Sequence, residues 1–132
     1  MSKWTGVFPA VTTKLHQDGS MDLPATQASI DRLIQNGVSG IIVLPMLGEN
    51  ASLRVQDKEA VIVAAKEVIA GRVPLLSGLA EVSTEAAVTS ARLFESYGAE
   101  GLMAFPRGER ERVTAVIKQT ITDLGRRAAR AA

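Results

Sequence analysis

The chain has 132 residues, 46% of them hydrophobic and 22% charged, and a formal net charge of +1. This composition favours one globular domain with a real core, and the near-zero charge gives no reason to expect a nucleic-acid or membrane partner. The absence of cysteine excludes disulfides, thiolate metal sites and cysteine nucleophiles. No apolar run approaches the ~20 residues of a membrane span, and no signal-peptide pattern opens the chain. We therefore expect a cytoplasmic protein.

The first half of the sequence predicts two strands around one helix. Residues 6–11 form a short apolar run, in which Pro9 favours an irregular or edge strand. Asp22 can cap a helix that has Pro24 in its first turn and ends at Asn36-Gly37. The uninterrupted apolar run 40–44 is typical of a parallel strand covered on both faces.

The second half repeats this alternation twice. A helix is expected over about 55–70, with these residues inward: Ala60, Val61, Ala64 and Val68. Residues 73–78 then predict a strand. Ser83 can cap a third helix, whose inner face carries Ala87, Ala91 and Phe94. Residues 101–105 complete the pattern as a fourth strand.

Beyond residue 106 the pattern changes to one long amphipathic helix over 107–125. Its apolar stripe recurs at helical spacing over Val113, Val116, Ile117, Thr120, Ile121 and Leu124. Residues 126–132 form a small basic tail. It has no aromatic residue to stack on bases, so we expect a solvated end rather than a nucleic-acid arm.

Strands that alternate with helices predict an α/β fold with parallel strands and right-handed crossovers. Two joints between helix and strand repeat, residues 36–41 and 97–102, each with a glycine just past a helix. An open doubly wound sheet would normally carry a phosphate loop, which the sequence lacks. The alternative is a parallel (βα)4 half of a TIM (β/α)8 barrel, followed by the C-terminal amphipathic helix. All 132 residues would form this single incomplete domain.

The motifs that carry a family resemblance run from residue 6 to residue 106. They are Gly6-Val7-Phe8-Pro9-Ala10, Asp18-Gly19, residues 37–44 followed by Gly48-Glu49, residues 74–78 through 83–87, and residues 98–103 with Pro106. In order and spacing they resemble the dihydrodipicolinate synthase and N-acetylneuraminate lyase family. The resemblance implies a class I aldolase or lyase barrel that acts on pyruvate or a related 2-oxo acid, without a cofactor. In that family a lysine on the sixth strand forms a Schiff base and a tyrosine on the fifth carries protons.

The chain departs from this family pattern in its catalytic residues. The strands that carry the Schiff-base lysine and the catalytic tyrosine are missing. The only tyrosine, Tyr97, is predicted at the end of a helix, away from the catalytic side. The final helix resembles the one that closes full-length members. An internal deletion, a natural short variant or a chain cut on purpose each account for this. We expect a truncated copy that is inactive alone.

The substrate loop also departs from the family. Where relatives place glycine and two hydroxyl residues, this chain has Pro45, Met46 and Leu47, followed by Gly48 and Glu49. The resemblance makes Met46, Leu47, Gly48 and Glu49 the substrate-binding residues. Backbone N–H groups at Met46 and Leu47 can still bind a carboxylate, although Leu47 cannot relay a proton. We expect Met46 to pack, and Glu49 to be the best candidate for a buried carboxylate, bracing the loop.

Among five lysines, Lys14 alone follows a strand, at the rim where barrel chemistry occurs. It is the one weak catalytic candidate, and we expect a solvated loop lysine. The helical Lys58, Lys66 and Lys118 are expected on solvated faces. His16, the only histidine, has no second ligand at metal-binding spacing, so no metal site is expected.

Three hypotheses remain open. The chain is an incomplete lyase or aldolase, a non-catalytic half-barrel that assembles with itself or a full-length relative, or a residual binder of small 2-oxo acids. Unpaired edges at both ends of the sheet favour a homo-oligomer. The inner face of a half-barrel would also expose apolar residues, expected to be Ile42, Leu44, Leu75 and Leu102 or their neighbours.

Overall fold

The computed structural model describes residues 4–105, 119 and 122–123. In chain order the elements are α1 (Leu23–Gln35), β1 (Ile41–Val43), the 3-10 turns η1 (Met46–Gly48) and η2 (Asn50–Ser52), α2 (Val55–Ile69), β2 (Leu75–Leu79), α3 (Thr84–Tyr97) and β3 (Gly101–Ala104). The final helix expected over 107–125 and the tail 126–132 lie outside the described residues, except for three helical positions. No helix in the described part is long and apolar enough to cross a membrane.

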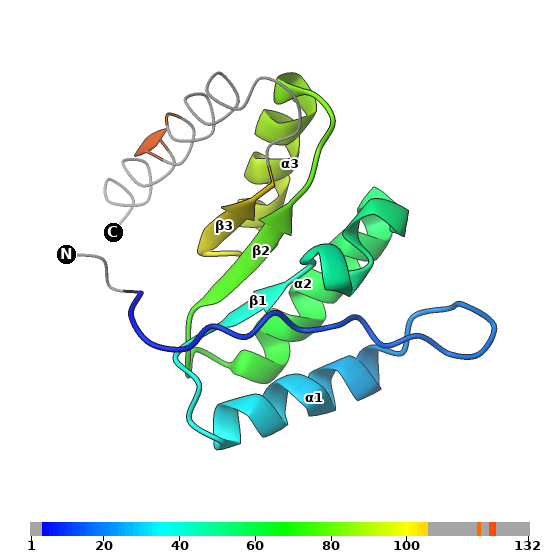
Figure 1. Cartoon of the computed structure of the whole chain (residues 1–132), viewed down its shortest axis with the longest axis vertical. Coiled ribbons are helices and arrows are strands. Elements are labelled where there is room, and N and C mark those ends of the chain that lie inside the picture. Colours follow the sequence, from blue (N-terminus) through cyan, green and yellow to red (C-terminus); the bar gives the residue numbers. More distant parts are fainter. Residues whose placement is uncertain (1–3, 106–118, 120–121, 124–132) are drawn as a thin grey trace.

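The sheet is parallel, with the order β1-β2-β3 (Figure 1). The expected first strand, residues 6–11, is not a regular strand and forms one parallel bridge, Ala10 to Ile42. The Val11 N–H donates to the Ile42 carbonyl at 2.9 Å, and the Ile42 N–H donates to the Pro9 carbonyl at 3.1 Å. Pro9 has no N–H of its own to extend this pairing. The predicted parallel order is therefore confirmed, with the first segment reduced to a bridge.

The helix boundaries follow from capping residues predicted from the sequence. The Asp22 carboxylate accepts a hydrogen bond from the Ala25 N–H at 2.9 Å and begins α1. The Ser83 hydroxyl accepts one from the Ala86 N–H at 3.1 Å and begins α3. Gly98 ends α3 with a positive φ of 114°, a conformation that favours glycine. The caps place both helices as expected.

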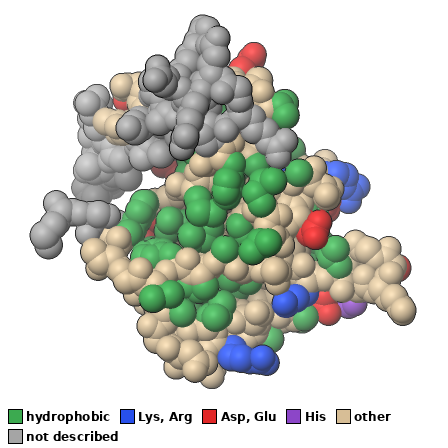
Figure 2. All heavy atoms as spheres, in the orientation of Figure 1, with side chains coloured by type: hydrophobic (Ala, Val, Ile, Leu, Met, Phe, Trp, Pro, Cys, Tyr) green, Lys and Arg blue, Asp and Glu red, His purple; other side chains and the backbone are tan. Residues whose placement is uncertain are grey.

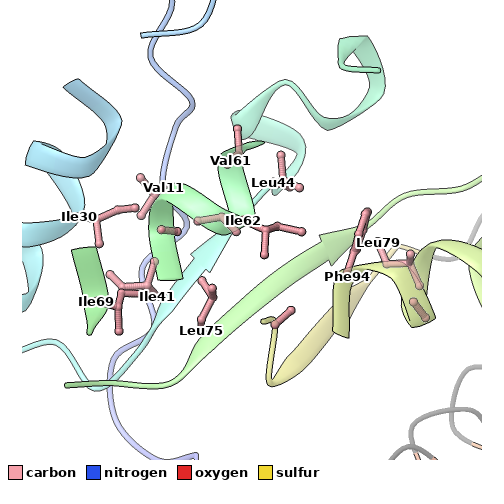
Figure 3. Packing of buried hydrophobic residues seen from close by; sticks show 14 of the residues in the cluster. Val11, Ile30, Ile41, Leu44, Val61, Ile62, Ile69, Leu75, Leu79 and Phe94 are labelled. Carbon is pink, nitrogen blue, oxygen red and sulfur yellow. The ribbon is translucent and has the colours of Figure 1, made fainter. Parts of the chain in front are cut away.

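The main core lies between the sheet and the three helices (Figure 3). Ala87, Ala91 and Phe94 of α3 are buried there, as predicted. The predicted inner face of α2 was partly wrong, because Ala60 is only half-buried and is not part of the core, whereas Val68, also half-buried, packs against it as predicted. The face is completed instead by Ile62, Ala65 and Ile69. An apolar stretch such as 60–65 is too uniform for its helical phase to be read from sequence.

Alternate strand residues point to the two faces of the sheet. Leu75 and Leu44 belong to the helix-side core, so the expectation that they line the inner barrel face was wrong. Leu102 also packs against that core. Leu44 lies beyond β1 and has a positive φ, so it leaves the alternation of that strand. Ile42 and Leu76 alternate with the core residues Ile41, Val43 and Leu75 and face the inner side. Both are only 8% exposed, so the expectation that the inner face leaves such residues exposed was wrong. A continuous apolar run gives no phase for this alternation, which is why the sequence could not distinguish Leu75 from Leu76.

The amino-terminal segment covers part of the inner face with two aromatic rings. A Cβ on Gly40 would collide with the Phe8 ring, and a Cβ on Gly101 would collide with the Trp4 ring. These glycines therefore let the rings approach the starts of β1 and β3. Hydrophobic side chains gather over the middle of the face presented in Figure 2.

Candidate functional site

The candidate site lies where β1 and β2 end and the chain passes to the following helices. In parallel (β/α) barrels the connections after the strands form the catalytic face. Three such connections are described: residues 12–22 before α1, residues 44–54 before α2, and residues 80–83 before α3. They lie toward the arrowheads of the strands in Figure 1.

The connection after β1 is a tightly wound loop. Leu44 and Glu49 both have positive φ, 53° and 62°, a conformation that costs a non-glycine residue of the order of 1 kcal/mol or more. Between them lie the buried Pro45 and the turn η1, which is closed by a 2.9 Å hydrogen bond from the Gly48 N–H to the Pro45 carbonyl. A loop with two such residues needs outside support to persist.

Asn50 supplies that support. Its side chain is buried, with 1% exposure. The amide nitrogen donates to the Leu44 carbonyl at 2.6 Å and to the Gly78 carbonyl at 3.2 Å. One side chain therefore fastens the end of β1 to the end of β2. Its Oδ1 is buried and has no hydrogen-bond partner. Gly78 is required at this junction, because a Cβ there would collide with the Leu44 carbonyl.

A second support comes from the connection that precedes α1. The Thr13 hydroxyl, on a residue that is 7% exposed, donates to the Gly48 carbonyl at 2.8 Å. The Lys14 N–H in turn donates to the Thr26 hydroxyl of α1 at 3.0 Å. These bonds join the first two connections to each other, and Asn50 joins the second to the end of β2, which fixes their relative positions.

The four predicted substrate-binding residues share this loop but differ in exposure. Gly48 is buried, while Met46 and Leu47 are exposed, so the expectation that Met46 packs was wrong. Glu49 is exposed, so its prediction as a buried carboxylate was wrong. The positive φ at Glu49 turns the chain so that the next residue, Asn50, is the buried polar side chain. The loop therefore presents apolar side chains and one carboxylate to solvent.

The described lysines occupy three different environments. Lys14 is exposed, and its ammonium donates to the Thr12 hydroxyl at 2.8 Å. Lys66 is half-exposed and pairs with Glu100 at 3.1 Å. Lys58 was expected on a solvated face, and this was wrong. It is buried near the start of α2, 3.6 Å from Glu81 in the connection after β2.

The Lys58–Glu81 pair is extended by a third residue. The Ser90 hydroxyl of α3 donates to the Glu81 carboxylate at 2.9 Å. Burial of the Lys58 ammonium is tolerated because an opposite charge lies beside it. This group joins the connection after β2 to the helices on both sides. The sequence offered no sign of it, because a lysine at a helical position is normally solvated.

The remaining titratable residues do not assemble into a metal site. Among the described residues, no group of three or more His, Asp or Glu side chains lies close enough to hold an ion. His16 lies 3.7 Å from Asp22. Tyr97 is the last residue of α3, and burial followed by the charge of Glu59 raises the pKa of its phenol. Tyr97 lies where α3 ends and the chain turns back toward β3, opposite the connections that follow the strands.

Sequence reasoning missed Asn50 and Thr13, which brace the loop. Asn50 directly follows the charged Glu49 and precedes Ala51-Ser52, so its polarity alone does not mark it as buried. Nothing in the sequence distinguishes Thr13 from its exposed neighbour Thr12.

Known proteins share both the sequence and the fold. The model of the dihydrodipicolinate synthetase family matches residues 3–106. The chain is 36% identical over 104 residues to YjhH of Escherichia coli K12, a probable 2-dehydro-3-deoxy-D-pentonate aldolase, covering 79% of this chain. It is 39% identical over 100 residues to the 4-hydroxy-tetrahydrodipicolinate synthase of Methanoculleus marisnigri, covering 74% of this chain. The crystal structure of YagE from E. coli K12 in complex with pyruvate is 27% identical to this chain, with a TM-score of 0.79, and the match covers 90% of this chain and 41% of YagE.

The match covers only part of these relatives. The chain spans about a third of the two curated relatives, 35% and 34% of their lengths. Within that part, the family model covers nearly all of the described residues, and the fold agrees with the first units of a (β/α) barrel. The chain therefore belongs to the dihydrodipicolinate synthetase family.

Proposed function

We propose that the chain forms the first half of a barrel that acts as a lyase or aldolase on pyruvate or a related 2-oxo acid. In this proposal the loop after β1 binds the carboxylate of the acid. The observation that carries it is the family match over residues 3–106, which includes this braced loop. Residues 1–132 would form a single incomplete domain, with a helix over 107–125 and a basic tail over 126–132.

The geometry of the loop supports carboxylate binding. The first N–H groups of a helical turn have no partner within the turn, and here they belong to Met46 and Leu47. Successive backbone N–H groups in a tight turn are a common binding site for anions. The bonds from Asn50 and Thr13 hold the loop in one conformation before the acid arrives, which lowers the entropic cost of binding.

The described part does not supply an obvious nucleophile. An imine mechanism needs a lysine whose amine is deprotonated and directed at the substrate carbonyl, and it needs no added cofactor. Lys14 lies in an exposed loop, and Lys58 and Lys66 lie on α2. We infer that this segment binds the acid while the Schiff-base lysine belongs to strands that it does not contain.

Borohydride trapping tests this division of roles. Incubation of the chain with pyruvate and borohydride should leave its intact mass unchanged, because no imine forms. A trapped adduct at Lys14 would make that residue the nucleophile and overturn the inference. In parallel, calorimetric titration with pyruvate should show saturable binding. The Asn50→Ala variant should bind more weakly, while Asn36→Ala, an exposed control directly after the end of α1, should match the parent chain.

We also propose that the half-barrel self-associates or assembles with a full-length relative. Within the described residues, β3 pairs only with β2, and residues 7–11 pair only with β1. These strand edges favour a second copy. Light scattering over a dilution series should give a mass above that of the monomer. A stable monomer at micromolar concentration with cooperative melting would contradict this assembly.

A further inference from the structure

The amino-terminal segment, residues 4–8, places two aromatic rings at the amino ends of two different strands. The Phe8 ring fills the space that a Cβ on Gly40 would need, directly before β1. The Trp4 ring fills the same space at Gly101, the first residue of β3. Since β2 lies between β1 and β3 in the sheet, this short segment reaches from one side of β2 to the other.

Both rings lie on the inner face of the sheet. Gly101 is in register with the inner residue Leu76, and residues paired on neighbouring strands point to the same side. Gly40 comes two positions before the inner residue Ile42, so it also lies on this side. The Trp4 ring is therefore placed beside Leu76, which agrees with the low exposure of that side chain, 8%.

Ser39 fastens the middle of the segment to the chain that leads into β1. Its N–H donates to the Val7 carbonyl at 2.8 Å, and its hydroxyl accepts from the Val7 N–H at 3.1 Å. The chain bends at Gly6, which has a φ of 101° and lies so close to Ser39 that a Cβ would collide with that side chain. Residues 5–7 are exposed, whereas the two rings are half-buried. The segment thus turns its rings inward and its remaining residues outward.

We propose that residues 4–8 act as a strap that closes the inner face of the sheet at the amino ends of the strands. The strap is fastened to the approach of β1 by Ser39 and contacts β3 through the Trp4 ring. It shields this end of the face from solvent and small molecules, opposite the connections that form the candidate site. It goes beyond the function proposed above and does not depend on it.

The test uses two properties of the sequence, which has no cysteine and has Trp4 as its only tryptophan. Leu76→Cys introduces a single thiol beside the Trp4 ring, and the control Val63→Cys introduces one at an exposed position of α2. Each is combined with Trp4→Ala in the full chain, and labelling by a water-soluble maleimide is followed by intact mass. Loss of the ring should speed labelling at position 76 about tenfold or more, since part of the apolar burial of a tryptophan ring corresponds to that factor. The rate at position 63 should stay unchanged.

Acrylamide quenching of the Trp4 emission is a second measurement that needs no cysteine. In the folded parent chain, quenching should be about twofold or more weaker than in urea, because the ring is packed against the sheet. Gly101→Ala puts a methyl group where the ring lies and should raise quenching toward the unfolded value. In the matched control Gly71→Ala the new Cβ meets open space, so quenching should stay as in the parent.

Several outcomes would overturn the strap. One is equal labelling at position 76 with and without the Trp4 ring. Another is faster labelling at position 63 as well, which would mean that the whole chain loosens rather than one end of the face opening. If Leu76→Cys does not fold, quenching decides alone, and a Gly101→Ala chain as protected as the parent would refute the contact with β3. No 2-oxo acid takes part in these measurements, so their failure leaves the proposed function untouched.

Discussion

The replacement Asn50→Ala should destabilise the chain more than its size suggests. It removes the donors of two buried hydrogen bonds, to the Leu44 and Gly78 carbonyls. A buried acceptor left without its donor costs about 1–3 kcal/mol. The Gly78 carbonyl keeps a 3.2 Å bond from the Ser77 hydroxyl, so the full cost applies mainly at Leu44. Removing the unpartnered Oδ1 of Asn50 offsets part of the loss. We expect a net loss of about 2 kcal/mol in unfolding free energy.

Urea denaturation at one protein concentration measures this loss. The matched control is Asn36→Ala, which removes an exposed amide bonded to the Arg32 carbonyl at 2.7 Å and should cost about 0.5 kcal/mol or less. The two variants should keep the same denaturant dependence as the parent chain, so that midpoints report stability. If Asn50→Ala and Asn36→Ala lose equal stability, Asn50 does not brace the loop after β1.

The variant Asn50→Asp adds a test of the same contact through pH. A carboxylate at this buried position would face two carbonyl oxygens, so its pKa should be raised in the folded state. A group with a raised folded pKa contributes stability below its unfolded pKa, and this is lost as pH rises through the folded pKa. The stability deficit of Asn50→Asp relative to the parent should therefore be smallest near pH 4 and grow toward pH 7. A deficit independent of pH would contradict the burial of this side chain.

Three further predictions concern the surroundings of the connections after the strands. Gly78→Ala should lower the unfolding free energy by about 2 kcal/mol or more, because the added Cβ would collide with backbone atoms. Gly19→Ala has open space around it and a φ of 85°, and should cost about 1 kcal/mol. Equal losses in urea denaturation would refute the close approach at Gly78. Lys58→Met should lower the unfolding free energy by about 1–2 kcal/mol, because it leaves Glu81 without its buried partner. Lys66 forms a shorter but more exposed ion pair, so Lys66→Met should cost about 0.5 kcal/mol. The reverse order of melting temperatures would show that distance matters more than burial. Asp57 has a pKa lowered by its hydrogen bond from the arginine that precedes α2, so its contribution is present above its ordinary pKa and is lost as pH falls. The difference in melting temperature between the parent and Asp57→Asn should therefore shrink from pH 7 to pH 3, and a constant difference would contradict this linkage.

The local features of the fold were readable from the sequence because they depend on near neighbours. Asp22 and Ser83 cap helices through bonds to residues three positions away. The spacing of Ala87, Ala91 and Phe94 defines a helix face without reference to the rest of the chain. The alternation of strands and helices then predicts a parallel sheet, because each crossover returns the chain in the same direction.

The connections after the strands were poorly predicted, because their structure depends on contacts between distant segments. Glu49 is exposed and Asn50 buried because the chain adopts positive φ at Leu44 and at Glu49, where a sequence gives no glycine to signal it. Lys58 is buried because Glu81, 23 positions later, lies beside it. These pairings become visible only when the connections after the strands are brought together.

The central claim is that the loop after β1 binds the carboxylate of a 2-oxo acid. The most direct measurement is an amide ¹H–¹⁵N chemical-shift titration of the full chain with pyruvate. The account predicts saturable shifts concentrated at Met46, Leu47 and Gly48, with smaller shifts at Thr13, whose hydroxyl bonds to this loop. Shifts that fail to saturate, or that centre on residues outside the connections after the strands, would contradict it.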